Sequence, residues 1–202
     1  MRRTKIICTM GPATDNEDVL RDLMLNGMDV ARLNFSHGSH EEALERINRI
    51  KKVRDELNIP VAILLDTKGP EVRIKTFKDG KASLKAGQTF SLCTYDVEGD
   101  ETQVSITYKD LHKDIGLGTK ILIDDGLIEL EVINIKDGKI ICNVINGGVL
   151  SNQKGVNIPN ISLSLPYMSK KDEEDILFGI EQDVDFIAAS FVRTADDIMD
   201  IK

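Results

Sequence analysis

Polar side chains suited to ligand binding follow an apolar segment near the start of the chain. The stretch VARLNFSHGSH, residues 30–40, opens with apolar residues and then carries Arg32, Asn34 and Ser36. An arginine can bind a phosphate or carboxylate through two parallel hydrogen bonds, whereas asparagine and serine offer neutral oxygens. Each of these residues alone is also common on a surface or in a turn, but their close spacing indicates a binding site.

Three further apolar segments end in polar sequences of the same kind, TMGPAT at 9–14, DTKGPEVR at 66–73 and SFVR at 190–193. The carboxyl ends of parallel strands meet at one edge of a sheet, where the following helices also begin. Asp66 adds a charged oxygen, and hard oxygens from neighbouring strands suit a hard cation. An anion and a cation held side by side are what phosphoryl transfer requires. Neither GxxxxGKS/T nor GxGxxG occurs, so the usual phosphate-binding loops are not expected.

Alternating strands and helices would position these residues. The expected strands are the apolar segments at residues 5–10, 30–34 and 61–66. The intervening helices are expected to begin with capping boxes, formed by Thr14 with Glu17 and by Ser39 with Glu42. Apolar residues then recur at helical steps, at Val19, Leu20, Leu23 and Met24 and at Leu44, Ile47, Ile50, Val53 and Leu57. This alternation predicts a parallel sheet covered by helices.

From about Glu71 the pattern changes to short segments rich in β-branched residues. These segments are residues 71–77, 90–95, 103–108, 120–135 and 139–145. KDG sequences at 78–80 and 136–138 are typical of hairpin turns. We therefore predict an all-β unit, either a small barrel or a sandwich.

The helical pattern resumes at Ser169. Ser169 with Asp172, and Thr194 with Asp197, predict capping boxes for two helices, and residues 184–191 predict a fourth buried strand between them.

The resulting prediction is an α/β fold, a partial (β/α)8 TIM barrel with an inserted all-β, barrel-like cap domain. The expected domains are residues 1–70 for the first three β/α units, 71–166 for the cap and 167–202 for the resumed barrel. A complete barrel needs ~250 residues, so we expect half a barrel at most. An end one turn into a helix resembles a cut more than a natural terminus.

The charge, the apolar runs and the cysteines of the chain argue against several kinds of binding partner. The chain has 34 acidic and 26 basic residues and a net charge of −8, which argues against nucleic-acid binding. No apolar run approaches the ~20 residues that span a bilayer and no signal-peptide core is present, so we expect a cytoplasmic protein without a membrane partner. Cys8, Cys93 and Cys142 match no metal-ligand spacing, which indicates reduced structural thiols.

Six motifs carry a resemblance to a known family. They are KIICTMGPAT (5–14), DVARLNFSHG (29–38), LLDTKGPEVR (64–73), IDDG (123–126), KGVNIPN (154–160) and DFIAASFVR (185–193). In this order and spacing the chain resembles the N-terminal half of pyruvate kinases, from about residue 3 to 202. The resemblance implies a barrel with a mobile β cap inserted after the third strand. It also implies a glycolytic phosphotransferase that moves the phosphoryl group of phosphoenolpyruvate to ADP, giving pyruvate and ATP.

The resemblance further implies roles for residues of this chain. Arg32 corresponds to the arginine that holds the phosphoryl-bearing substrate. The implied potassium site consists of Asn34, Ser36, Asp66 and Thr67, the last through its backbone carbonyl. The implied nucleotide-binding positions are Asn34, Phe35, Ser36, His37, Arg73 and Lys154. His37 is equally common as a solvated loop residue. Asp124 and Asp125 are not included, because Asp-Gly is also a frequent hairpin turn.

The family's catalytic lysine, and the glutamate and aspartate that bind Mg²⁺, correspond to no residue of this chain because they lie on later barrel strands. The resemblance thus implies K⁺ binding within the chain, Mg²⁺ ligands beyond Lys202 and a homotetrameric parent enzyme, and it leaves the association state of this piece open. We expect the 202 residues alone to be inactive, because no metal would meet the charge that develops in transfer. Departures from the family pattern at Asn160 and Tyr167 concern local loop geometry.

Two other classes of function are left open. One is a stand-alone, non-catalytic module that binds a nucleotide or an anion. The other is a structural fragment in which the cap folds while the half barrel stays loose, since four strands leave two open edges. A different barrel enzyme that uses phosphoenolpyruvate would not explain the all-β insertion at this position.

Overall fold

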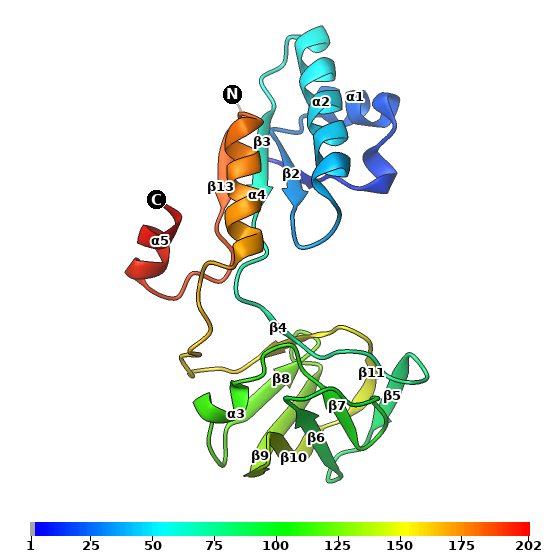
Figure 1. The fold of residues 1–202 in the computed structure, drawn as a ribbon. Coiled ribbons are helices and arrows are strands. Elements are labelled where there is room, and N and C mark those ends of the chain that lie inside the picture. The colour runs from blue at the N-terminus through cyan, green and yellow to red at the C-terminus, as the bar shows by residue number, and fades with distance from the viewer. Residues whose placement is uncertain (1–2) are drawn as a thin grey trace. The chain divides into compact units, whose positions relative to one another are not determined.

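The computed structural model describes residues 3–202, and the chain forms two compact units. The first unit contains the residues up to Pro70 together with Pro166–Lys202, and the second unit is Glu71–Leu165. Figure 1 shows helices and parallel strands in the first unit and mainly antiparallel strands in the second. The predicted α/β class with an all-β insertion is therefore confirmed.

A four-stranded parallel sheet is the centre of the first unit. Its strands, in order across the sheet, are β1 (Ile7–Thr9), β2 (Val30–Asn34), β3 (Ala62–Asp66) and β13 (Phe186–Ala188). The register between β2 and β3 sets Arg32 opposite Leu64 and Asn34 opposite Asp66. The carboxyl ends of these two strands therefore lie side by side.

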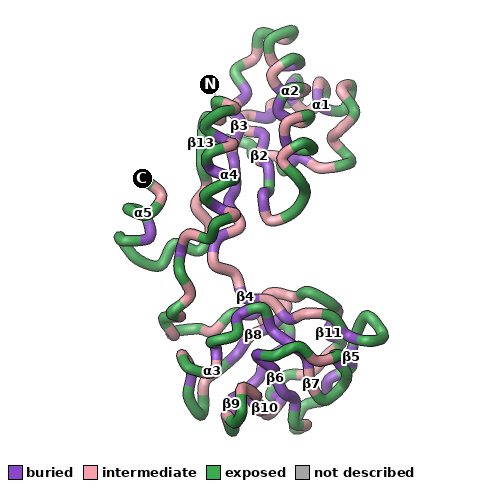
Figure 2. Tube along the Cα trace, viewed as in Figure 1, coloured by how far each residue is buried: buried purple, intermediate pink, exposed green. Residues whose placement is uncertain are grey.

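The core of the first unit lies on one face of this sheet. Helices α1 (Glu17–Leu25) and α2 (His40–Leu57) pack against it, and the core combines Leu20, Met24, Ile47, Ile50 and Val53 of the helices with Ala31, Leu33, Ile63 and Leu65 of the strands. Burial alternates along β2 because successive side chains point to opposite faces. Figure 2 shows the buried positions of the strands and of the helix faces that meet them.

The prediction that the fourth strand is buried is wrong. Phe186 is 54% exposed and Ile187 is 36% exposed. The reason is that β13 pairs with β3 along one edge, and no other described strand lies along its second edge. The apolar sequence identified the strand correctly but not its burial.

Three of the four predicted helix starts are confirmed by their caps. Ser39 accepts a hydrogen bond from the Glu42 amide at the start of α2. Complete capping boxes at Ser169 and Thr194 begin the other two helices of the first unit, α4 (Lys170–Glu181) and α5 (Ala195–Ile201). None of the helices within residues 3–202 is both long enough and apolar enough to cross a membrane.

The predicted start of α1 at Thr14 is wrong. Asn16 is the N-cap, and its side-chain oxygen accepts hydrogen bonds from two amides of the first turn. Thr14 instead closes a 3-10 turn, η1 (Pro12–Thr14), through hydrogen bonds to the backbone of Gly11. Asparagine is at least as good an N-cap as threonine, and Pro12 favours the tight turn that uses Thr14.

The second unit contains a seven-stranded sheet, a two-stranded ribbon and one short helix, α3 (Leu111–Asp114). The sheet order is β4 (Val72–Arg73), β12 (Gly155–Asn157), β8 (Lys120–Ile123), β9 (Ile128–Lys136), β10 (Lys139–Asn146), β6 (Thr89–Cys93) and β7 (Gln103–Ser105). The ribbon pairs β5 (Lys81–Leu84) with β11 (Gly148–Ser151). Aliphatic side chains and Phe90 contribute to a hydrophobic core within the second unit.

The two KDG sequences have different outcomes. Residues 136–138 connect β9 to β10 in a hairpin, as predicted. Residues 78–80 also form a turn, but the strand that follows, β5, pairs with β11, so the predicted hairpin is wrong there. A turn sequence specifies a local reversal and not the partner of the next strand. The IDDG sequence is a hairpin turn between β8 and β9, with Asp124 and Asp125 both at positive φ.

The cysteines are free thiols, as predicted. Cys93 and Cys142 are fully buried in the second unit. Burial raises the pKa of the Cys142 thiol to about 12, so it stays protonated and unreactive at neutral pH.

Replacing Asn16 with alanine is expected to lower the free energy of unfolding by about 1 kcal/mol, because two amides of α1 lose their acceptor. Urea denaturation followed by circular dichroism measures this change. Asn48→Ala, on the exposed side of α2, is the matched control and should stay within about 0.5 kcal/mol of the wild type. Equal losses in the two variants would contradict Asn16 as the cap.

Candidate functional site

Arg32 is held in place at the carboxyl end of β2. Its Nε and Nη2 donate to Asp66 Oδ2 over 2.8 and 2.5 Å, and its Nη1 donates to Thr9 Oγ1 over 2.8 Å. Asp66 Oδ1 accepts a hydrogen bond from Ser190 Oγ at 2.9 Å. Three of the five N–H groups of the guanidinium are thereby used, and two remain for a ligand. The side chain is 36% exposed, so an anion can reach it.

Oxygen atoms gather beside Arg32 at the ends of β2 and β3. Asn34 lies opposite Asp66 in the sheet, and Asn34 Oδ1 accepts from the Ser36 amide at 2.9 Å. Thr67 is buried, and its amide donates to Ala188 O at 3.1 Å. The Ser36 hydroxyl has no hydrogen-bond partner among residues 3–202. One carboxylate among neutral oxygens is a donor set that fits a hard cation of low charge.

The structure contains no cluster of three or more His, Cys, Asp or Glu side chains that could hold a metal ion within residues 3–202. The oxygen set described above therefore differs from a carboxylate-rich or histidine-rich metal centre.

The loop between β2 and α2 separates two of the predicted nucleotide-binding residues. Phe35 is 5% exposed and its ring belongs to the core of the first unit, while its N–H donates to Asp66 O at 3.0 Å and its carbonyl accepts from Lys171 Nζ at 2.8 Å. His37 is exposed at the tip of the loop, next to Gly38 at φ +85°.

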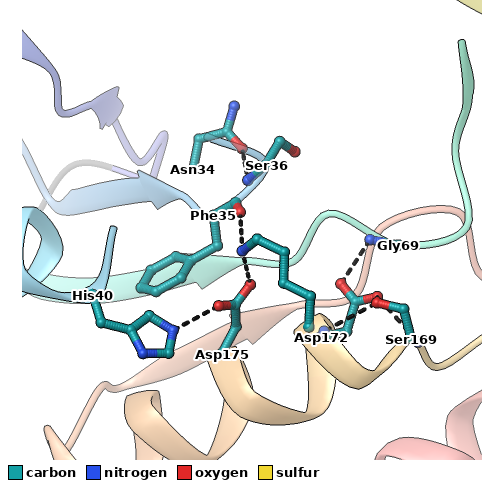
Figure 3. Close-up of polar contacts among 9 residues, drawn as sticks. Asn34, Phe35, Ser36, His40, Gly69, Ser169, Asp172 and Asp175 are labelled. Atoms are coloured by element: carbon teal, nitrogen blue, oxygen red, sulfur yellow. Dashed lines mark hydrogen bonds and ion pairs between the residues drawn. The ribbon is translucent and has the colours of Figure 1, made fainter. Parts of the chain in front are cut away.

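Two buried carboxylates on α4 make contacts that the sequence did not predict, although Asp172 was expected to cap the helix with Ser169. Asp172 Oδ1 accepts from the Gly69 amide at 2.9 Å, and Asp175 contacts His40 and Lys171 (Figure 3). Asp172 and Asp175 are 2% and 1% exposed. The available signal was their spacing, because they share the buried face of α4 with Ile176.

Arg73 and Lys154 lie in the second unit, where Arg73 ends β4 and Lys154 directly precedes the neighbouring strand β12. Arg73 Nη1 donates to Gln153 O at 2.8 Å, and Nη2 pairs with Glu71 at 2.8 Å, which raises the pKa of the arginine. Arg73 Nε is buried and has no partner within the described part of the chain. Lys154 Nζ lies 2.9 Å from Asp124 Oδ1, so the IDDG turn is also an ion-pair partner of a predicted nucleotide-binding residue.

Comparisons with known proteins agree along the whole chain. The family model described as pyruvate kinase, barrel domain, matches residues 1–202. Curated relatives named pyruvate kinase are 52% identical in Staphylococcus haemolyticus, 51% in Staphylococcus aureus and 50% in Staphylococcus epidermidis, each over 204 aligned positions. These alignments cover 100% of this chain and 35% of each relative, so the chain spans about a third of their length.

Gly69→Ala is expected to lower the free energy of unfolding by about 1–3 kcal/mol. Gly69 has φ +65°, and an added Cβ would lie 2.6 Å from the Ser190 carbonyl oxygen, beside the serine that bonds Asp66. Gly11→Ala is the control, since Gly11 is extended at φ −170° and no atom lies within 4 Å of the added Cβ. Thermal unfolding of the two variants measures the difference, and equal melting temperatures would contradict the strain.

Proposed function

The chain belongs to the pyruvate kinase family, and we propose that the complete protein transfers the phosphoryl group of phosphoenolpyruvate to ADP, giving pyruvate and ATP in glycolysis. The observation that carries the proposal is the guanidinium of Arg32, oriented by Asp66 and Thr9 beside a set of hard oxygens. The same proposal makes the complete protein a cytoplasmic homotetramer, in line with the resemblance to the family.

Arg32 is proposed to bind the phosphoryl group of phosphoenolpyruvate. Its two remaining N–H groups offer charge-assisted hydrogen bonds to phosphate oxygens. Because Asp66 and Thr9 already hold the guanidinium, it need not reorganise when charge develops on the transferred group. This is the kind of positioning and charge neutralisation on which phosphoryl transfer depends.

Asn34, Ser36, Asp66 and the backbone carbonyl of Thr67 are proposed to hold K⁺. When bound, the ion supplies a positive charge next to the substrate anion. Asp66 would serve both functions, since the same carboxylate orients Arg32 and belongs to the oxygen set. Mg²⁺, the second proposed cofactor, is assigned to no residue of this chain.

In the first unit, Asn34, Phe35, Ser36 and His37 are proposed as nucleotide-binding positions. In the second unit, Arg73 and Lys154 are proposed as nucleotide-binding positions, as the resemblance to the family implies. Lys154 supports this proposal, because its side chain is 36% exposed and an ammonium group suits a phosphate anion.

Arg32→Met in the complete protein is expected to lower kcat/KM for phosphoenolpyruvate about 100-fold or more. Arg32→Lys should recover only part of this loss, since an ammonium cannot make the same bidentate contacts. Pyruvate formation coupled to lactate dehydrogenase measures both. Arg21→Met, which removes a partly exposed arginine paired with Glu56, is the control. Unchanged turnover in Arg32→Met would contradict the proposed role.

The isolated 202-residue chain is expected to form no pyruvate above a mock-purified control, because the proposed Mg²⁺ site is not assigned to it. Isothermal titration with ADP on the same sample separates the remaining classes of function. Binding without turnover would indicate a nucleotide-binding module, whereas steady pyruvate formation would show that these residues suffice for catalysis.

A further inference from the structure

Asp175 is a buried carboxylate at a position where an apolar side chain would complete the core face of α4. It is 1% exposed. Burial of a carboxylate is costly unless the charge is paired and hydrogen-bonded. An imidazole and an ammonium group provide these contacts. His40 Nε2 lies 2.7 Å from Asp175 Oδ1 (Figure 3), and Lys171 Nζ lies 2.5 Å from Asp175 Oδ2.

Both partners of Asp175 contact or belong to the loop that carries the proposed ligand-binding residues. His40 is the first residue of α2 and ends this loop. Lys171 Nζ also donates a hydrogen bond of 2.8 Å to the carbonyl oxygen of Phe35, at the start of the loop. One carboxylate on α4 is therefore tied to both ends of the segment 35–40.

Ring contacts join the same elements independently of charge. The imidazole of His40 stacks on Phe178 of α4, with centroids 4.5 Å apart and planes 15° apart. Phe178 also lies 6.0 Å from the ring of Phe35. These contacts hold His40 flat against α4, so its Nε2 is directed at Asp175.

The contact at Phe35 has a consequence for the adjoining peptide plane. The carbonyl of residue 35 and the N–H of residue 36 belong to one planar trans peptide and point in opposite directions. The carbonyl faces Lys171, and the N–H donates to Asn34 Oδ1 at 2.9 Å. The contact with Lys171 and the contact with Asn34 therefore share one peptide plane, so a rotation of that plane would disturb both.

We propose that Asp175 is a positioning residue: through Lys171 and His40 it fixes the loop 35–40, and thereby the oxygens of Asn34 and Ser36 that are proposed to bind K⁺. The inference rests on the proposed function for its consequence in catalysis. Buried charged pairs are often no more stabilising than apolar residues of the same size, so the role of Asp175 lies in orientation rather than in stability. Arg32 depends on a different set of contacts, to Asp66 and Thr9.

The test compares Asp175→Asn with Glu174→Gln in the complete protein. The two substitutions remove the same charge from adjacent residues of α4, and the Glu174 side chain is 57% exposed. Asp175→Asn is expected to raise the K⁺ concentration for half-maximal activity about tenfold, with KM for phosphoenolpyruvate changed less than about twofold. Choline chloride keeps the ionic strength constant, and Glu174→Gln should match the wild type in both constants. Equal changes in the two constants, or no change in the K⁺ constant, would overturn the proposal.

Two further variants keep the proposal falsifiable if Asp175→Asn does not fold. Lys171→Met removes the donor to Phe35 and should raise the K⁺ constant as Asp175→Asn does, whereas Lys171→Arg should restore it to within about threefold of the wild type. Full activity at wild-type K⁺ concentrations in Lys171→Met would overturn the positioning role.

Hydrogen exchange separates this inference from the proposed function. The amides of residues 36–38 should exchange at least tenfold faster in Asp175→Asn or Lys171→Met than in wild type, while those of β2 and β3 keep their rates. Wild-type protein without K⁺-dependent turnover would overturn the proposed function. The exchange rates of residues 36–38 in the two variants would then still test whether Asp175 and Lys171 fix the loop 35–40. Rates unchanged from wild type would overturn that claim.

Discussion

The parallel register of β2 and β3 is the constraint on which the candidate site depends. It sets Asn34 opposite Asp66 and leaves Arg32 within hydrogen-bonding distance of the same carboxylate. Since side chains alternate between the two faces of a strand, a slip of one residue would turn Arg32 toward the core and Leu33 away from it. Leu33 is 4% exposed, so the packing of the core enforces the register and with it the geometry of the site.

Three buried carboxylates then fix the loops at the ends of the strands. Asp66 contacts Arg32 and Ser190, Asp172 accepts from the Gly69 amide, and Asp175 contacts Lys171 and His40, which adjoin the loop between β2 and α2. Each carboxylate is at most 9% exposed. Because a buried charge without its partners is unfavourable, each of these loops has one strongly preferred position. Apolar packing thus orders the sheet and the helices of the first unit. Hydrogen bonds and ion pairs of the buried carboxylates order the loops that follow the strands.

Local sequence signals were most reliable where a single residue type meets a single structural demand. The bounds of β2 were predicted without error, and Ser169 and Thr194 begin helices as their capping boxes indicated. The errors arose where two residues could each cap the same helix, or where a strand pairs with a segment distant in the sequence. Asn16 and not Thr14 is the N-cap of α1. The strand after the KDG at 78–80, β5, pairs with β11 rather than with the strand before the turn.

The sequence by itself determined the alternation of strands and helices, the all-β insertion and the polar residues that follow each strand, because these depend on periodicity and residue type over short distances. It also placed Arg32, Asn34 and Asp66 at strand ends. Only the tertiary structure decided which distant side chains each buried carboxylate contacts. His40 and Asp175 are 135 positions apart, and the sequence around an acidic residue on a helix does not indicate which distant side chain it will contact. Such a pair exists only once sheet and helix are packed, because the contact follows from their position and not from either segment alone.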